Sequence, residues 1–305
     1  LVSFIVVSHH PCSYTACTDC KVKMAAVVFN SLSLLCGMYR QLKPYPTKTK
    51  YGLPLPPQCH VEISDEEIRN RPILIIGDIH GCYDELENLI NQAQIVANTA
   101  DIYCIFVGDM INKGPKNLEV LTFVRNLTSK GNAAAVKGNH EESLLREYRS
   151  MSQDKDYQLS SKYKYLSTFS TDDFHYLQNL PYSLTIPKIN SIVVHAGLVP
   201  DVPLKHQCLI DLCHMRNIVY SSHLWGQVAI GHSKVDEGVA WASRWSGPQH
   251  VYYGHDARRG LQDLPYSTGL DTGCVYGFRL TGIIIKPTGE RHFLSVPAQM
   301  SYYSS

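Results

Sequence analysis

The chain has 305 residues, 44% of them hydrophobic and 18% charged, which is enough to bury the core of one large or two small domains. Its net charge of +1 provides no general attraction to nucleic acid or to an anionic membrane, and we expect no DNA partner. Since no window approaches about 18 consecutive apolar residues, we also expect no membrane span.

The N-terminal part of the chain differs in composition from the rest. Residues 1–70 are predicted to be a poorly ordered extension, and their stretch PYPTKTKYGLPLPPQ (44–58) to be a stiff linker. The stretch 24–61 contains basic residues but no acidic one, so organellar targeting by this leader stays open. The ten cysteines lack the regular spacing of a disulfide framework and favour a reducing compartment, and we therefore predict a cytoplasmic location.

Strand and helix patterns alternate from about residue 72. The run ILII (73–76) predicts a buried strand, and YDELENLINQAQIV (83–96) has the periodicity of a helix. The alternation continues with strands at 102–108 and 133–138 and with helices at 117–127 and from 141 onward. Strand–helix–strand units of this size join parallel neighbours through right-handed crossovers, so the first half predicts an α/β fold.

The second half of the chain has a different pattern. Residues 150–180 are polar and rich in tyrosine, and they are predicted to form an inserted helical cap. Short strands separated by turns are then predicted at 182–186, 191–197, 249–255, 267–273 and 279–287. We expect two mixed sheets packed together with helices outside, in a domain spanning 71–295 that is followed by a tail at 296–305.

Polar side chains follow each strand of the first half. They stand in G-D-I-H-G at 77–81, G-D-M-I-N-K-G-P at 108–115 and G-N-H-E at 138–141. Because the carboxyl ends of neighbouring parallel strands meet at one edge, these loops are expected to converge on one crevice. Two later strands end in His195 and His255 in the same manner. Together these loops offer six oxygen or imidazole ligands, more than one metal ion needs and about what two require.

Each of these motifs, taken alone, has an ordinary structural explanation. An Asp-x-His sequence is usually a turn whose histidine is satisfied locally, and Asn-His is usually a helix cap. The conjunction of five strand ends is more specific, because a buried ionisable group is costly unless it is paired or coordinated. Gly77 and Gly81 further indicate that the backbone turns sharply or approaches another segment closely there.

The motifs GDIHG, GDMINKGP, GNHE, VHAGL and YYGHDA resemble those of the calcineurin-like metallophosphoesterases, in the branch of the phosphoprotein phosphatases, over residues 72–285. The resemblance implies a four-layer αββα sandwich with a site for two divalent metal ions. It implies that the ligands are Asp78 and His80 at the first ion, Asp109 between both ions, and Asn139, His195 and His255 at the second. It also implies that His140 is the general acid.

The chain departs from the protein serine/threonine phosphatases at one motif. They carry G-D-x-V-D-R-G, whereas this chain has Asn112 and Lys113 in place of the last Asp-Arg pair. That aspartate pairs with the catalytic histidine, so Asn112 leaves open what orients His140. Lys113 offers phosphate a mobile point charge where an arginine offers two hydrogen bonds, and Lys113 and Asn139 are the predicted substrate-binding residues.

The N-K-G form is instead similar to the ApaH-like phosphatases, relatives of the bacterial symmetrical diadenosine tetraphosphatases. The stretches WASRWSGPQHVYYGHDARRGLQ (241–262) and LDTGCVYG (270–277) share this similarity. It implies a hydrolase that uses metal-activated water on phosphoanhydrides, such as dinucleoside polyphosphates, polyphosphate or RNA caps, or on phosphomonoesters. Manganese is expected by family analogy, while iron and zinc also suit the ligands. A protein serine/threonine phosphatase is the alternative, and an inactive nucleotide-binding module is a third hypothesis.

Five further residues carry weaker signals. Asp271 either positions a metal-binding histidine or is an ordinary turn aspartate. Trp241 and Trp245 either stack a nucleobase or, as the favoured interpretation, pack into the core. Arg258 and Arg259 either reach a polyphosphate chain or form a solvated charged pair.

Overall fold

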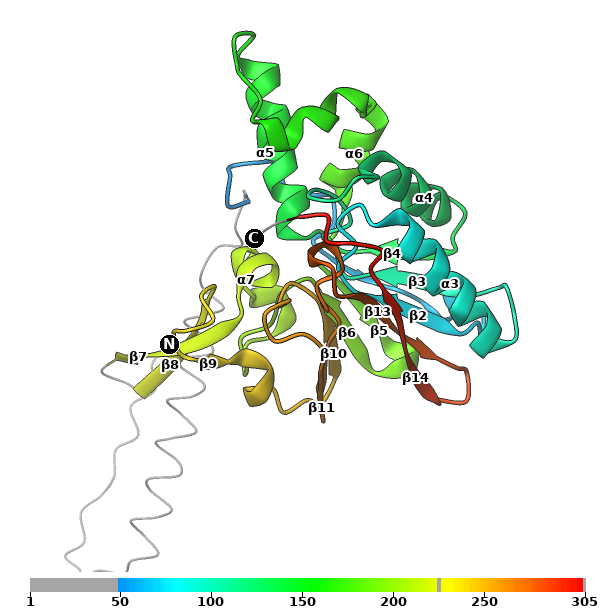
Figure 1. The fold of residues 1–305 in the computed structure, drawn as a ribbon. Helices are drawn as coiled ribbons and strands as arrows, with labels where there is room; N and C mark the ends of the chain where they lie inside the picture. The colour runs from blue at the N-terminus through cyan, green and yellow to red at the C-terminus, as the bar shows by residue number, and fades with distance from the viewer. Residues whose placement is uncertain (1–48, 224–225, 304–305) are drawn as a thin grey trace, which may run out of the picture. The chain divides into compact units, whose positions relative to one another are not determined.

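Two β-sheets pack face to face in the computed structural model, which describes residues 49–223 and 226–303 (Figure 1). The first sheet has the strand order β14 (Arg291–Pro297), β13 (Arg279–Ile285), β2 (Ile73–Ile76), β3 (Tyr103–Phe106) and β4 (Ala133–Ala135). Strands β2, β3 and β4 run parallel, as the sequence predicted, while β13 lies antiparallel to β2. Helices α3 (Tyr83–Ala97) and α4 (Asn117–Ser129) connect the parallel strands.

The second sheet is also mixed. Its strand order is β1 (His60–Glu62), β5 (Ser183–Ile186), β6 (Ser191–Val194), β10 (His250–Tyr253), β12 (Ser267–Gly269) and β11 (Gln262–Leu264). Strands β6, β10 and β12 run parallel to one another. A small third sheet holds β7 (Asn217–His223), β8 (Gly226–His232) and β9 (Val239–Ala240), which the sequence analysis did not predict.

The remaining helices are short, apart from α5. They are α2 (Asp65–Ile68), α5 (Asn139–Gln153), α6 (Thr171–Asn179) and α7 (Leu209–His214), with 3₁₀ turns at Ser161–Thr168, Pro187–Ile189, Leu204–His206, Trp241–Arg244 and Cys274–Tyr276. No helix among residues 49–223 and 226–303 is long and apolar enough to cross a membrane.

The four layers follow from the alternation of side chains along the strands. Leu74 of β2 packs in the cluster that includes the buried faces of α3 and α4. The next residue, Ile75, points the other way and belongs to the cluster that contains Val193 of the second sheet. Val194 faces outward again and shares a third cluster with Leu212 of α7. The chain therefore has the predicted αββα sandwich, and its two sheets share the central core.

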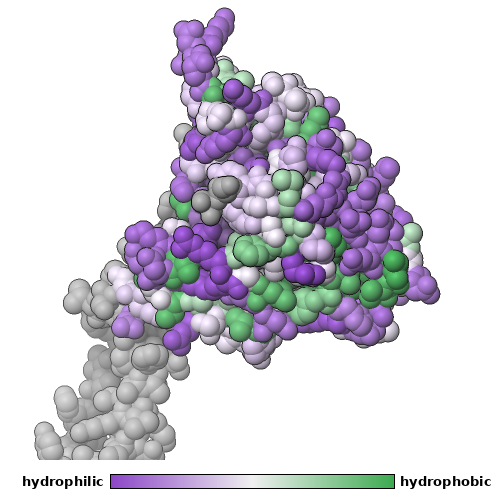
Figure 2. Space-filling view, in the orientation of Figure 1, coloured by the Kyte–Doolittle hydropathy of each residue, from purple (hydrophilic) through white to green (hydrophobic). Residues whose placement is uncertain are grey.

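The predicted cap is helical but begins earlier than residue 150. Helix α5 runs without a break from the ligand loop at Asn139 to Gln153, so the cap grows directly out of the G-N-H-E motif. It continues through the turn at Ser161–Thr168 into α6, and these segments project from the sandwich (Figure 1). The projecting tip is hydrophilic (Figure 2), whereas Tyr148 and Phe174 stack at its base with ring centroids 3.6 Å apart.

The folded unit includes residues that the sequence analysis assigned to the N-terminal extension. Strand β1 pairs in parallel with β5, and α2 begins at a capping box formed by Ser64 and Glu67. Ile63 and Ile68 are both buried in the core between the sheets. A strand of three residues has too little periodicity to be recognised after a proline-rich stretch. The predictions for residues 1–48 lie outside the described residues.

The segment after β13 is also integrated into the fold. Strand β14 pairs with β13 along its whole length. The residues that follow, predicted to be a tail, hydrogen-bond to the turn before β13: Ala298 N–H donates to Phe278 O at 2.9 Å, and Tyr302 N–H donates to Val275 O at 3.0 Å.

We predict that Ile68→Ala lowers the free energy of unfolding by about 2–5 kcal/mol, because Ile68 is fully buried and a cavity would replace its side chain. Chemical denaturation of the full chain measures this change. The matched control is Ile95→Ala on α3, where the side chain is 78% exposed and we expect a change within about 0.5 kcal/mol. Equal, small effects would show that residues 60–68 contribute nothing to the domain.

Candidate metal centre

The structure brings together, at one edge of the sandwich, the five loops that carry the candidate ligands. Asp78 and His80 follow β2, and Asp109 follows β3. The loops that follow β6 and β10 reach this edge from the second sheet. Gly254 N–H donates to the carbonyl of His195 at 2.8 Å, and His255 N–H donates to the Asp78 carboxylate at 3.1 Å. The two sheets are therefore joined directly through candidate ligands.

Asp109 lies at the centre of this arrangement. Its Oδ2 is 3.6 Å from His80 Nε2 and 3.9 Å from His140 Nε2, while its Oδ1 is 3.4 Å from His195 Nε2. The ligand atoms form two groups that share this carboxylate, one with His80 and His140 and the other with His195 and His255. Each carboxylate oxygen thus faces a different group of imidazoles, which is the disposition expected of a carboxylate that bridges two cations.

Each of the three candidate histidine ligands is oriented by a hydrogen bond from one ring nitrogen to a main-chain carbonyl. His80 Nδ1–H donates to Ile111 O at 3.1 Å, and His195 Nδ1–H donates to Val107 O at 2.9 Å. His255 uses its other nitrogen, since its Nε2–H donates to a main-chain carbonyl, that of residue 214, at 3.1 Å. In a neutral ring, an outer N–H fixed in this way leaves the inner nitrogen without a proton and free to bind a metal ion. Burial lowers the pKa of His195, but the Asp109 carboxylate outweighs burial and raises that pKa above its ordinary value, so an ion bound at this ring would displace a proton.

The remaining predicted ligands flank the two groups. Asn139 Oδ1 lies 3.0 Å from His195 Nε2. Asp78 stands outside both groups, and its two oxygens accept the N–H of His255. Burial, and then the carboxylates of Asp271 and Asp109, hold the pKa of Asp78 well above its ordinary value. Cations placed among these carboxylates would remove that repulsion, so the buried charges fit a site for divalent metal ions.

The backbone at the site is strained. Five of its residues have the left-handed conformation that side chains rarely adopt: His80 (φ 48°), Asp109 (49°), Asn112 (76°), Lys113 (72°) and His255 (67°). Each such residue costs on the order of 1–3 kcal/mol, and such strain gathers at functional sites where the surrounding fold enforces it. The strain therefore marks the same loops that the motifs mark.

Both glycines that flank Asp78 and His80 have the predicted steric role. A Cβ on Gly77 would lie 2.3 Å from Leu270 O, so only glycine allows this close approach to the second sheet. Gly81 has φ 74°, the sharp turn that leads the chain away from the first ligand pair.

Glu141 connects two ligand loops, and the sequence analysis did not recognise it. Its Oε2 accepts the N–H groups of Asp109 (2.9 Å) and Gly138 (2.8 Å), and its Oε1 accepts that of Met110 (2.9 Å). Burial, followed by the charge of Asp109, raises the pKa of Glu141 to about 7. Its place as the third residue of α5 is a capping position, which was the only sequence signal for this role.

Asn112 orients His140. The Lys113 N–H donates to Asn112 Oδ1 at 3.0 Å, which turns the amide nitrogen toward the ring, and Asn112 Nδ2 lies 2.8 Å from His140 Nδ1. His140 Nδ1 therefore accepts this hydrogen bond, and its proton is on Nε2, which faces Asp109. Burial in the first place lowers the pKa of His140 to about 4, so the ring is neutral near pH 7.

Lys113 extends over the first group. Its ammonium donates to His80 Nε2 at 3.0 Å and lies 5.1 Å from the centroid of the Tyr276 ring. The positive charge therefore stands next to a candidate metal ligand, between that ligand and an aromatic face.

The weaker sequence signals belong mostly to the packing of the domain. Asp271 Oδ1 accepts the N–H of Gly273 at 3.1 Å, as in a turn. Trp241 is buried and its Nε1–H donates to Ala196 O at 3.0 Å, while Trp245 packs edge-on against it. Arg259 pairs with Asp256 and with Asn217, so its guanidinium is engaged within the domain.

A third buried group lies behind the first ligand loop. It contains Cys82, Glu85 and Cys274, of which Glu85 Oε1 accepts the N–H of Gln299 at 2.9 Å and the hydroxyl of Tyr302 at 2.8 Å. Glu85 thereby ties the C-terminal segment to the start of α3.

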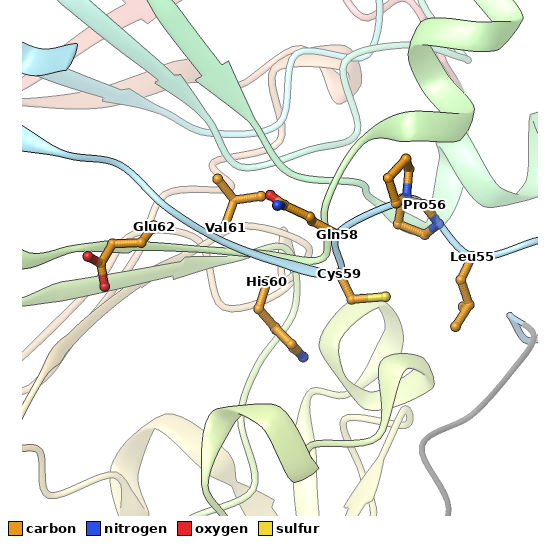
Figure 3. A pocket seen from close by; sticks show the side chains of 8 residues that line it. Leu55, Pro56, Gln58, Cys59, His60, Val61 and Glu62 are labelled. Carbon is orange, nitrogen blue, oxygen red and sulfur yellow. The ribbon is translucent and has the colours of Figure 1, made fainter.

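A hollow of about 610 Å³ lies elsewhere, along residues 55–62, and none of the candidate ligands lines it. Figure 3 shows this segment entering β1 with His60 and Val61 on opposite sides of the ribbon. The candidate site is therefore defined by its donor atoms and not by the size of a cavity.

Comparison with known proteins agrees with this geometry. A family model described as calcineurin-like phosphoesterase matches residues 71–259. The chain belongs to this family, and it is a metal-dependent hydrolase. Divalent metal ions are its cofactors.

The similar proteins have related names. The chain is 28% identical over 248 residues to the asymmetrical bis(5'-nucleosyl)-tetraphosphatase PrpE of Bacillus subtilis, covering 76% of this chain and 96% of that protein. It is also 28% identical over 278 residues to the symmetrical bis(5'-nucleosyl)-tetraphosphatase of Coxiella burnetii, covering 75% and 92%. A solved structure provisionally described as a diadenosine tetraphosphatase is 34% identical, with a TM-score of 0.64 over 79% of this chain and 98% of that one.

We predict that Glu141→Gln weakens manganese binding by about 10- to 100-fold, because the single amide oxygen cannot accept both from Asp109 and Gly138 on one side and from Met110 on the other, so the contact between the two loops is weakened. The free energy of unfolding should fall by roughly 1–3 kcal/mol, since a buried N–H would face an amide N–H. Titration calorimetry and denaturation measure the two effects, with Glu87→Gln on the exposed face of α3 as the control. Unchanged metal affinity would contradict the role given to Glu141.

Proposed function

We propose that the chain hydrolyses phosphoanhydride bonds of nucleoside polyphosphates with the help of two divalent metal ions. The observation that carries this proposal is the Asp109 carboxylate, whose two oxygens face separate imidazole groups 3.4 Å and 3.6 Å away. The names of the similar tetraphosphatases support the same class of substrate.

Six side chains would hold the two ions: Asp78 and His80 the first, Asp109 both, and Asn139, His195 and His255 the second. Bound ions at this site would supply Lewis-acid polarisation of the phosphate and a water activated near neutral pH. The mixed carboxylate, amide and imidazole donors suit manganese, which we propose as the metal, and iron or zinc would also fit them. We place this activity in the cytoplasm, as the scattered cysteines predict.

His140 is the proposed general acid. Its ring is neutral near pH 7 and its Nε2–H faces the carboxylate around which the substrate phosphate would bind. The Nε2–H can therefore donate a hydrogen bond to the leaving oxygen as that oxygen separates from phosphorus, and Asn112 holds the ring so that this nitrogen, and not Nδ1, carries the proton.

Lys113 and Asn139 are proposed to bind the substrate phosphate. An ion at His80 Nε2 would replace the hydrogen bond that Lys113 now donates there and leave the ammonium to the phosphate oxygens. Charge that develops on these oxygens during hydrolysis would then be stabilised by a nearby cation.

A substrate panel tests the proposed function. With added manganese, we expect cleavage of diadenosine tetraphosphate, inorganic polyphosphate or capped RNA in preference to a phosphoserine peptide. The nucleotide products also distinguish symmetrical from asymmetrical cleavage, since two molecules of ADP or one each of ATP and AMP would form. We expect His140→Ala to lower kcat by about 10²–10⁴. Turnover of the phosphopeptide alone would favour a protein phosphatase, and manganese binding without any turnover would favour an inactive nucleotide-binding module.

We predict that Asn112→Asp introduces a new inflection in the pH–rate profile. An aspartate facing Nδ1 would accept a proton from it and raise the pKa of His140 from about 4 toward neutrality. The neutral ring would then carry its proton on Nδ1, so the rate should fall as pH rises through the raised pKa. The unsubstituted enzyme should show no such inflection between about pH 5 and pH 8. Adding His140→Gln to the variant should remove the inflection, and a profile that Asn112→Asp leaves unchanged would contradict the orientation given to His140.

A further inference from the structure

We propose that Tyr276, Phe278 and Tyr303 form an aromatic shelf that binds the nucleobase of the substrate beside Lys113. This inference rests on the proposed function. It concerns recognition of the nucleobase, the part of the substrate that the metal centre does not distinguish. The shelf takes its residues from two places, the turn that precedes β13 and the C-terminal segment.

The three rings lie together around one turn. The Tyr276 and Tyr303 rings meet edge to face, with centroids 6.3 Å apart and planes at 71°. Gly273 brings the third ring close, since a Cβ there would lie 3.0 Å from Phe278 Cδ2 and 3.5 Å from Tyr276 Cδ2. The rings of Phe278 and Tyr276 therefore flank the same glycine.

These rings are accessible to a ligand. The side chain of Phe278 is 66% exposed and that of Tyr303 is 39% exposed, while Tyr276 is half-buried. A single exposed aromatic residue needs no explanation, but neighbouring exposed rings next to a functional site indicate a binding surface. The tryptophan pair considered from the sequence offers no such surface, because Trp241 is only 1% exposed.

The shelf lies within reach of the reacting phosphate. The Lys113 ammonium lies 5.1 Å from the Tyr276 centroid and 3.0 Å from His80 Nε2, so one side chain connects the aromatic ring with a candidate metal ligand. A phosphate held by Lys113 would therefore place its ester substituent against the shelf. A nucleoside phosphate has an aromatic base at that position, whereas inorganic polyphosphate has only further charged groups.

The C-terminal segment holds the shelf in place. The N–H groups of Tyr302 and Tyr303 both donate to Val275 O, at 3.0 Å and 3.1 Å. The Tyr302 hydroxyl donates to the buried carboxylate of Glu85 at 2.8 Å, and the N–H of Ala298 donates to the main-chain carbonyl of Phe278 at 2.9 Å. A surface fixed before binding loses little entropy when a planar ligand stacks on it.

Stacking on such a surface predicts recognition of any base, because every base has an aromatic face. The shelf should therefore favour nucleoside phosphates over inorganic phosphates without selecting adenine from guanine. Base–aromatic stacking is worth enough to expect about a tenfold gain in affinity from one ring.

The test compares the binding of AMP with that of orthophosphate to the manganese-loaded full chain by titration calorimetry. We expect AMP to bind at least about tenfold more tightly, and the double variant Phe278→Ala, Tyr303→Ala to lose that preference while its affinity for orthophosphate stays unchanged. The matched control is Phe293→Ala on β14, a 40% exposed aromatic residue outside the shelf, which should keep the preference.

Turnover separates this proposal from the proposed function. In the double variant, kcat/KM should fall by about tenfold or more for diadenosine tetraphosphate and stay unchanged for inorganic tripolyphosphate. Equal affinities of the unsubstituted chain for AMP and orthophosphate, or an AMP preference that survives the double substitution, would overturn the shelf. A chain that prefers AMP through these residues but cleaves no phosphoanhydride would keep the shelf and overturn the proposed function.

Discussion

The site depends on one buried carboxylate. Asp109 is 2% exposed, and burial alone would raise its pKa, but the facing imidazoles of His195 and His140 bring that pKa well below its ordinary value. A buried charge of this kind persists only where partners surround it. Its Oδ1 accepts the N–H of His140 at 2.9 Å, and its own N–H donates to Glu141. The neighbouring loops are thus held together, because each supplies a group that interacts with this buried carboxylate or with its main-chain N–H.

The sandwich provides the rigidity that this convergence needs. Strands β2, β3 and β4 end side by side in one sheet, β6 and β10 end side by side in the other, and the apolar core between the sheets keeps the two edges in register. The left-handed backbone at His80, Asp109 and His255 costs free energy. Such a conformation persists only where the surrounding fold enforces it. The helix that carries His140 continues into the cap, so His140 and the cap share one helix.

The sequence predicted the parts of this structure that depend on local pattern. Buried runs such as ILII became β2, helical periodicity located α3 and α4, and the motif spacing placed Asp78, Asp109 and Asn139 one crossover apart.

The sequence did not predict contacts between distant segments. Strand β1 is recognised only through its pairing with β5, and the orientation of His140 only through the amide of Asn112. Glu141 looked like an ordinary capping residue, since its acceptor role requires the loop after β3 to lie beside it. The C-terminal residues had no pattern at all, and their position follows from hydrogen bonds to the turn at Val275 and to Glu85.

A crystal structure of the manganese-loaded chain, with the metal positions taken from anomalous scattering, tests the central claim most directly. The account predicts two manganese peaks on either side of the Asp109 carboxylate, about 3.5–4 Å apart, with one oxygen of that carboxylate or both in contact with each ion. A single ion, or a pair of ions coordinated without Asp109, would contradict it.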